Sequence, residues 1–130
     1  MEWEVEYTDE FEAWWDGLDE DAQEDVRAVV LLLVQQGPGL PFPFSSGISR
    51  SRHGHMRELR IQSCGKPLRV LYAFDPRRYA ILLLGGDKTG DNRWYETYVP
   101  VADRLYDEHL ATLRREEQLK NEKGESHDRP

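Results

Sequence analysis

The hydrophobic pattern changes from a strand period to a helical period within the first twenty residues. Trp3, Val5 and Tyr7 alternate with glutamates, which predicts a strand with one face on a core and the other in water. Thr8 is a suitable N-cap for a short helix that follows the strand. The apolar positions of this helix recur at helical spacing and are Phe11, Trp14, Trp15 and Leu18.

A second helix is predicted to begin at Asp19 and to stop at the sequence Gly37-Pro38-Gly39. One apolar stripe runs along it, made of Ala22, Val26, Val29, Val30, Leu33 and Val34. Two consecutive helices predict a helical hairpin. Residues 37–54 are rich in Gly, Pro, Ser and Arg and predict a loop or crossover, because proline neither continues a helix nor fits a central strand.

The strand period resumes in three segments, at residues 56–62, 68–74 and 79–85. Turn sequences separate them at residues 64–67 and 75–78, and Pro76 occupies the position that a type I turn favours, so an antiparallel meander is expected. A last helix is predicted from about Tyr98 or Pro100 to near Leu119. Residues 120–130 carry no apolar anchor and predict a mobile polar tail.

This element order, β-α-α-β-β-β-α, predicts an α+β fold in one domain that spans residues 1–119. The 130 residues of the chain are enough to bury a core without a metal or a disulfide. We expect the helical hairpin to pack on one face of a twisted antiparallel sheet and to leave the other face partly open.

The sequence predicts a cytoplasmic protein with no metal, no cofactor and no membrane segment. Its single cysteine, Cys64, cannot form an internal disulfide, and no Cys/His spacing suggests zinc. The longest apolar run, residues 29–34, is far shorter than the ~20 residues that cross a bilayer. The N-terminus is acidic where a signal peptide is basic.

Charge is distributed unevenly along the chain, although its total is −8. Residues 1–36 contain twelve acidic side chains and one basic side chain, whereas residues 50–78 contain eight basic and two acidic ones. Solubility alone does not require such a cationic segment, because interspersed charges achieve it as well. The segment therefore predicts a small surface that meets phosphates.

Strand alternation predicts where the basic residues gather. If Leu59 and Ile61 face the core, then Arg60 faces away, and the same alternation turns Arg69 to that side of the next strand. Lys88 and Tyr95 are expected at the same end of the sheet. A nuclease hypothesis requires the three cationic groups to share an open patch that is not occupied by neighbouring carboxylates.

The strand motifs resemble a known family. The segments Met56-Arg57-Glu58-Leu59-Arg60-Ile61 and Leu68-Arg69-Val70-Leu71-Tyr72-Ala73-Phe74-Asp75, then Ile81-Leu82-Leu83-Leu84 leading to Lys88, are similar to those of bacterial toxins of the RelE/HigB superfamily, in particular the phage-derived HigB-like branch. The resemblance covers residues 3–113. It implies the RelE-like fold and a messenger-RNA endoribonuclease, generally acting in the ribosomal A site, that a helix-turn-helix, HigA-like antitoxin neutralises.

The resemblance also implies roles for individual residues. Arg69 matches the arginine that clamps the scissile phosphate, while Arg60 and Lys88 add positive charge. Tyr95 or its neighbour Trp94 matches an aromatic catalytic position. The implied reaction is attack of a ribose 2′-hydroxyl on the adjacent phosphate, which needs no metal when cations stabilise the transition state. Arg69→Ala is expected to relieve growth arrest and to change stability by about 0.5 kcal/mol or less, as for an exposed arginine.

Further RNA contacts are expected from Arg57, His55, Arg93 and Trp94. Each residue has an alternative reading. Arg60 and Arg69 could be solvated surface arginines, Trp94 and Tyr95 could pack the last helix onto the sheet, and Arg57 shares the parity of the core-facing Leu59. His53 and His55 could also act as general bases, since imidazole titrates near neutrality.

Two features oppose a simple nuclease reading. The pI of about 5.0 departs from the basic character of many relatives, and Glu58 and Asp87 lie beside the proposed catalytic residues. The competing class is a binding protein without catalysis, acting on DNA gyrase or serving only as a co-repressor bound to the antitoxin; DNA would then be contacted only through that complex. The acidic helices could complement a basic antitoxin, with Trp14 or Trp15 as the contact residue.

Overall fold

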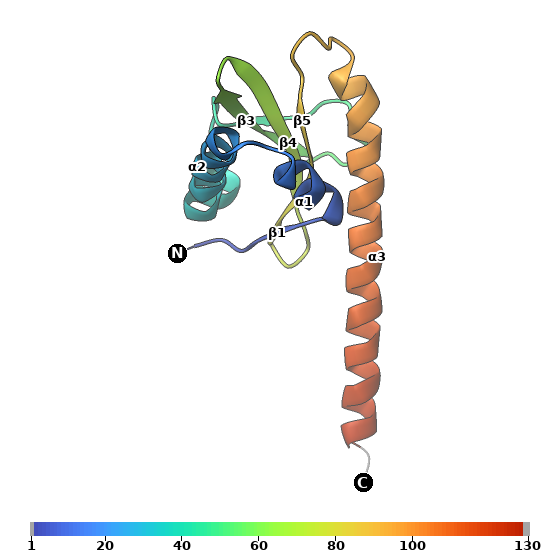
Figure 1. Cartoon of the computed structure of the whole chain (residues 1–130). Coiled ribbons are helices and arrows are strands. Elements are labelled where there is room, and N and C mark those ends of the chain that lie inside the picture. Colours follow the sequence, from blue (N-terminus) through green and yellow to red (C-terminus); the bar gives the residue numbers. More distant parts are fainter. Residues whose placement is uncertain (1, 129–130) are drawn as a thin grey trace.

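A five-stranded sheet forms the centre of the protein in this computed structural model, which describes residues 2–128 and the side chains as far as Lys123 (Figure 1). The strands are β1 (Val5–Tyr7), β2 (Ser45–Gly47), β3 (Arg57–Ser63), β4 (Lys66–Phe74) and β5 (Ala80–Asp87). Their order is β1-β5-β4-β3-β2. The predicted meander of β3, β4 and β5 is confirmed, but β1 pairs with β5 in parallel, so the sheet is mixed and not wholly antiparallel.

Capping residues fix the starts of the two N-terminal helices. The helices are α1 (Asp9–Asp16), α2 (Glu20–Gln36), the 3-10 turn η1 (Gly37–Gly39) and α3 (Trp94–Asp128). The Phe11 amide donates to the Thr8 hydroxyl at 3.0 Å, and the Ala22 amide donates to the Asp19 carboxylate at 2.8 Å. These bonds satisfy N–H groups that have no partner within the helix. α2 ends at Gly37, whose φ of +57° glycine adopts without strain.

Helices cover both faces of the sheet (Figure 1). Among the described residues, the protein has two hydrophobic clusters, one on each face of the sheet. The cluster between the sheet and helices α1 and α2 contains Phe11, Val26, Val29, Leu33, Leu40, Leu59, Ile61, Leu68, Val70, Tyr72, Ala80 and Leu82. The cluster between the sheet and the first half of α3 contains Met56, Leu71, Ala73, Ile81, Leu83, Trp94, Val99, Ala102, Leu105 and Tyr106. The sequence predicts a partly open second face, but α3 gives that face a core of its own, which is the main correction to the predicted fold.

α3 is longer at both ends than the sequence predicts. It begins ahead of Pro100, because Trp94 and Val99 are 2% and 0% exposed and their burial outweighs the hydrogen bond that proline cannot donate. Its C-terminal part extends beyond the sheet (Figure 1). Residues 120–128 are helical, and residues 129–130 lie outside the described residues. The mobility expected of residues 120–130 stays a prediction. Neither α3 nor any other described helix combines the length and apolar surface needed to cross a membrane.

The end of β5 lies between two tryptophans on opposite faces of the sheet. A Cβ atom on Gly85 would lie 2.1 Å from the Trp14 ring, and one on Gly86 would lie 2.7 Å from Nε1 of Trp94. Only glycine therefore allows α1 and α3 to approach the strand this closely. The contact with Trp94 fixes the start of α3, and hence the neighbouring Tyr95, against the edge of β4.

Candidate active site

Arg60 on β3 and Arg69 on β4 are directly opposite each other in the antiparallel pair, as the sequence predicts. Cross-strand neighbours have Cβ atoms about 4.5–5.5 Å apart, so the two side chains are adjacent on the face of the sheet that α3 covers. Their exposure differs. The Arg60 side chain is 30% exposed and the Arg69 side chain only 7%, because α3 extends over the position of Arg69. Arg69 is therefore not the solvated arginine that strand alternation alone suggests.

Glu58 connects the two arginines. Its Oε2 accepts a hydrogen bond from Arg60 Nη1 at 3.2 Å, and its Oε1 lies 3.5 Å from Arg69 Nε. Glu58 is 3% exposed. The nuclease hypothesis requires cations that are clear of neighbouring carboxylates, and Arg60 and Arg69 do not meet this condition. The physical reason is that a buried guanidinium is costly without a counterion, and Glu58 provides one.

The coordination of Arg69 is incomplete. Its Nη1 atom donates to the Leu68 carbonyl oxygen at 3.0 Å, but no acceptor among the described residues makes a hydrogen bond with its buried Nε atom. A buried donor without an acceptor raises the free energy of the folded protein. Glu58 Oε1, at 3.5 Å from this Nε atom, compensates its charge without completing a hydrogen bond.

Tyr95, in the first turn of α3, completes the contacts of Glu58. Its hydroxyl donates a 2.6 Å hydrogen bond to Oε1 of Glu58. Burial raises the pKa of Tyr95, and the hydrogen bond to Glu58 raises it further, while Arg69 acts in the opposite direction. The phenol therefore stays protonated at neutral pH and can donate a proton or a hydrogen bond.

Lys88 lies beside Tyr95, as expected from the sequence. Arg69 pairs with Gly86 on β5, so the residues just beyond the end of β5 are brought to this corner of the sheet. The Lys88 ammonium lies 5.2 Å from the centroid of the Tyr95 ring. The structure therefore brings together all four residues predicted as catalytic, in a continuous cluster with Glu58. We call Glu58, Arg60, Arg69, Lys88 and Tyr95 the basic cluster.

An open groove of about 390 Å³ reaches Arg60 and Arg69, the two residues of the basic cluster that line it. Its walls come from α2, from the loop before β2 and from the ends of β3 and β4, and the residues lining it include Asp25, Pro43, Phe44, Arg60, Gln62 and Arg69. β2 pairs with residues 57–59 and the Arg60 amide donates to the Phe44 carbonyl oxygen, so β3 is an edge only beyond Arg60. The sequence predicts neither β2 nor this groove, because Ser45–Gly47 shows no apolar alternation.

Two of the four additional RNA-contact residues lie near the basic cluster, but only one of them is accessible. Arg93 is exposed in the loop before α3. Trp94 is 2% exposed and packs over Gly86, so its ring is not available to stack on a base. The structure therefore corrects the expectation that Trp94 is available to RNA, and Tyr95 is the one of the two aromatics that contacts Glu58.

The other two lie elsewhere. Arg57 donates from Nε to the Ser45 hydroxyl at 3.0 Å, and that hydroxyl bonds Tyr72 in the core against α2, so Arg57 faces away from Arg60. His55 lies 3.2 Å from the Tyr106 hydroxyl, five residues before Arg60 and about 16 Å away along an extended chain. The structure therefore places Arg57 and His55 away from the basic cluster, and their contact with RNA stays a prediction.

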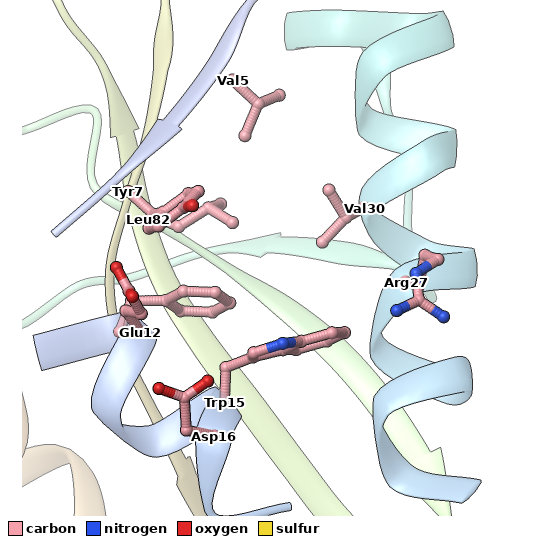
Figure 2. A pocket seen from close by; sticks show the side chains of 9 residues that line it. Val5, Tyr7, Glu12, Trp15, Asp16, Arg27, Val30 and Leu82 are labelled. Atoms are coloured by element: carbon pink, nitrogen blue, oxygen red, sulfur yellow. The ribbon is translucent and has the colours of Figure 1, made fainter. Parts of the chain in front are cut away.

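A second groove of about 440 Å³ lies between β1, α1 and α2 (Figure 2). It is lined by Val5, Tyr7, Phe11, Glu12, Trp15, Asp16, Arg27, Val30 and Leu82. The ring of Trp15 crosses the space between the two helices toward Arg27, whose guanidinium carbon is 5.2 Å from the ring centroid. Trp14 instead packs on Gly85. Of the two adjacent tryptophans, Trp15 is therefore the one that lines this groove.

Two residues near the basic cluster were not assigned a role from the sequence. Glu58 was considered only as an unfavourable charge, although its place on the same strand face as Arg60 predicted their contact. Phe42, whose ring lies 5.1 Å from the Arg60 guanidinium carbon, gave no signal within a proline-rich loop. Within the part of the chain that the structure describes, no three His, Cys, Asp or Glu side chains gather as metal ligands would.

The fold and the cluster define the class: a small α+β protein with an arginine pair on adjacent central strands of a mixed sheet. Residues 13–107 match the family model of the phage-derived protein Gp49-like (DUF891), and the chain belongs to this family. This assignment confirms the resemblance to the HigB-like branch of the RelE/HigB superfamily.

Relatives with curated names support the same branch. The chain is 43% identical over 101 residues to "Putative toxin HigB2" of Mycobacterium tuberculosis, a match that covers 76% of this chain but half of HigB2. It is 42% identical over 102 residues to "Putative toxin HigB3" of the same organism, covering 78% of this chain and 88% of HigB3. Among solved structures, the conserved hypothetical protein HP0894 from Helicobacter pylori is similar over 68% of this chain and 97% of its own, at 17% identity and a TM-score of 0.39.

Proposed function

We propose that this protein is the toxin of a type II toxin-antitoxin system and a metal-independent, ribosome-associated mRNA endoribonuclease that inhibits translation in the cytoplasm. The observation that carries the proposal is the pairing of Arg60 and Arg69 across β3 and β4, at a groove and in contact with a proton donor and a proton acceptor. Family membership and the HigB relatives support the toxin assignment.

The proposed reaction is attack of a ribose 2′-oxygen on the adjacent phosphorus. The P–O5′ bond breaks, which leaves a 2′,3′-cyclic phosphate on one fragment and a 5′-hydroxyl on the other. Glu58 would accept the proton of the 2′-hydroxyl, and Tyr95 would donate a proton to the leaving 5′-oxygen. Arg60, Arg69 and Lys88 would stabilise the negative charge that develops on the phosphate oxygens.

The pairing of both arginines with Glu58 is compatible with this role, because an arginine has five N–H donors. Arg69 also lines the groove, and in this proposal its guanidinium meets the phosphate there. Arg60 is partly exposed at the groove and can turn a second N–H toward a phosphate. In this proposal Glu58 offsets part of the positive charge of the site before RNA binds and receives a proton afterwards.

A helix-turn-helix, HigA-like antitoxin is the proposed partner, and the groove at Trp15 is its proposed site. The groove is mostly apolar, and Glu12 and Asp16 lie on its α1 side (Figure 2). Such a surface fits an apolar side chain from a basic segment of the antitoxin. The protein would then meet DNA only through the antitoxin.

A specific observation also favours the competing reading. Glu58 pairs with both arginines, and the total charge is −8, so the protein attracts RNA less strongly than a basic nuclease would. A binding protein that acts on gyrase, or that serves with the antitoxin as a co-repressor, would need no accessible arginines.

Induced expression in bacteria, followed by primer extension on abundant transcripts, separates these functions. The nuclease proposal predicts new 5′ ends within coding regions that depend on Arg60 and Arg69. Growth arrest with DNA-damage signalling and intact transcripts would instead indicate gyrase as the target. An expressed, folded protein without any effect on growth would leave only the co-repressor function.

A further inference from the structure

Phe42 is held in an exposed position beside the basic cluster. It is 69% exposed, more than any other large apolar residue whose exposure the structure describes. Its ring lies 5.1 Å from the guanidinium carbon of Arg60. An arginine that stacks on an aromatic ring has its planar group oriented while its N–H groups remain available at the edge.

The loop that carries Phe42 is fixed by hydrogen bonds. The amides of Phe44 and Ser45 both donate to the Pro41 carbonyl oxygen at 3.1 Å, and the Arg60 amide donates to the Phe44 carbonyl oxygen at 2.9 Å. Leu40, just before the loop, is 2% exposed and anchors it in the core. The loop that carries Phe42 is therefore fixed in position and is hydrogen-bonded to β3, the strand that carries Arg60.

The same loop forms one wall of the groove that reaches Arg69. Pro43 and Phe44 line this groove together with Arg60 and Arg69, and Phe44 is itself 39% exposed. The surface therefore combines exposed aromatic rings with two guanidinium groups. This combination is the one that proteins use for single-stranded nucleic acid, whose bases stack on aromatic rings while cations meet the phosphates.

We propose that Phe42 is a stacking platform for a nucleobase of single-stranded RNA whose phosphate lies against Arg60 and Arg69. This inference extends the proposed function, and it depends on that function for the choice of RNA as the ligand. The platform positions the substrate and takes no part in proton transfer. Because every base has a π-face, stacking on Phe42 increases affinity for single-stranded RNA without selecting one base.

The charge of the surroundings favours RNA over an apolar protein segment as the occupant. The groove beside Phe42 and Phe44 has two arginines, Arg60 and Arg69, and one carboxylate, Asp25, among its lining residues. The groove at Trp15 has the opposite balance, with two carboxylates and one arginine. A base with its phosphate uses both the rings and the cations. A protein helix would use only the rings.

The test is equilibrium binding of a fluorescein-labelled, single-stranded 2′-O-methyl RNA, which lacks the 2′-hydroxyl nucleophile and cannot be cleaved. Phe42→Ala is expected to weaken binding about tenfold, which is typical for the loss of one stacked base, while Phe42→Trp stays near the wild type. Leu119→Ala is a matched control, because it also removes an exposed apolar side chain, on the distal half of α3. A second probe, abasic at every position, is expected to bind wild type and Phe42→Ala equally.

If wild type and Phe42→Ala bound the base-containing probe with equal affinity, the inference would be wrong. It would also be wrong if Phe42→Ala lost as much affinity for the abasic probe as for the base-containing probe. If Phe42→Ala reduced antitoxin binding and left RNA binding unchanged, the occupant would be protein and the inference would be wrong. A wild type that cleaves mRNA without dependence on Phe42 contradicts the platform alone. A wild type that binds the probe through Phe42 but never cleaves mRNA supports the platform and contradicts the nuclease.

Discussion

The hydroxyl of Tyr95 donates a 2.6 Å hydrogen bond to Oε1 of Glu58, and this bond joins the start of α3 to the centre of the sheet. Glu58 in turn contacts the guanidinium groups of Arg60 and Arg69. The residues expected to form an open cationic patch therefore form a partly buried, charge-compensated cluster. The predictions below depend on this arrangement.

Glu58→Gln separates a catalytic role from a purely inhibitory one. If Glu58 accepts the proton of the 2′-hydroxyl, its replacement lowers the rate of mRNA cleavage by about 10²- to 10⁴-fold, although removal of one negative charge strengthens RNA binding. Cleavage rate and RNA affinity are measured on the same purified variant, and circular dichroism confirms the fold. Cleavage as fast as in the wild type, or faster, would show that Glu58 only blocks the arginines.

Tyr95→Phe keeps the ring under Lys88 and removes the hydroxyl. We expect cleavage to fall by about 10²-fold and stability by roughly 1–2 kcal/mol, because Glu58 loses a buried hydrogen bond. Tyr98→Phe is a matched control, since Tyr98 also lies in the first turns of α3 but is 37% exposed. An unchanged cleavage rate in Tyr95→Phe would exclude the hydroxyl as the proton donor.

The raised pKa of Tyr95 also predicts the alkaline limit of stability. Because burial and Glu58 disfavour the phenolate in the folded protein, the unfolded chain ionises first as the pH rises. The contribution of Tyr95 to the free energy of unfolding should therefore be independent of pH well below about pH 10 and decline above it. Tyr95→Phe should show a smaller decline, and the remainder is expected from Tyr106, whose pKa burial also raises. Identical alkaline denaturation profiles for both proteins would contradict the assignment.

The burial of Arg69 changes the expected cost of its removal. Arg69→Met should destabilise the protein by about 2–3 kcal/mol, well above the value for an exposed arginine, because buried Glu58 loses one of its counterions. The cost should be smaller in a Glu58→Gln background, with a coupling of roughly 0.5–3 kcal/mol. Urea denaturation of the wild type, the two single variants and the double variant measures this coupling. Additive effects would mean that the two side chains do not interact.

Trp15→Ala and Trp14→Ala form a matched pair for the proposed antitoxin site. Trp15→Ala should weaken antitoxin binding by about 2 kcal/mol or more, since aromatic residues in apolar grooves dominate many interfaces, while growth arrest persists. Trp14→Ala should instead destabilise the fold, because it leaves a cavity over Gly85. Calorimetry with a helix-turn-helix protein encoded beside this gene provides the measurement. Full affinity of Trp15→Ala would place the antitoxin elsewhere on the surface.

Most of the fold could be predicted from the sequence, because local signals are strong where the elements begin and end. Thr8, Asp19 and Gly37 mark helix ends through their own chemistry, and the alternation in β3 and β4 predicts the pairing of Arg60 with Arg69. The start of α3 was misplaced because Pro100 is typical of a first helical turn, whereas burial of Trp94 against Gly86 decides the boundary. That contact is tertiary and leaves no local pattern.

The sequence predicted which residues lie together at the candidate site, but not their burial or their contacts. Alternation shows which face a side chain takes, and it correctly grouped Arg60 and Arg69. It does not show what covers that face, and α3 buries Arg69 and brings Tyr95 to Glu58. Arg57 and His55 lie away from the cluster, because closeness in sequence does not imply the same face or the same end of a strand, and their contact with RNA stays a prediction.

The chemistry of the cleaved ends tests the central claim most directly. Purified wild-type protein is incubated with ribosomes programmed with a defined mRNA, and the fragments are analysed by mass spectrometry, with an Arg60→Ala, Arg69→Met double variant as the control. Cleavage by this cluster predicts fragments that end in a 2′,3′-cyclic phosphate and begin with a 5′-hydroxyl, and none of them with the double variant. Intact mRNA with the wild type, or fragments with 3′-hydroxyl and 5′-phosphate ends, would contradict it.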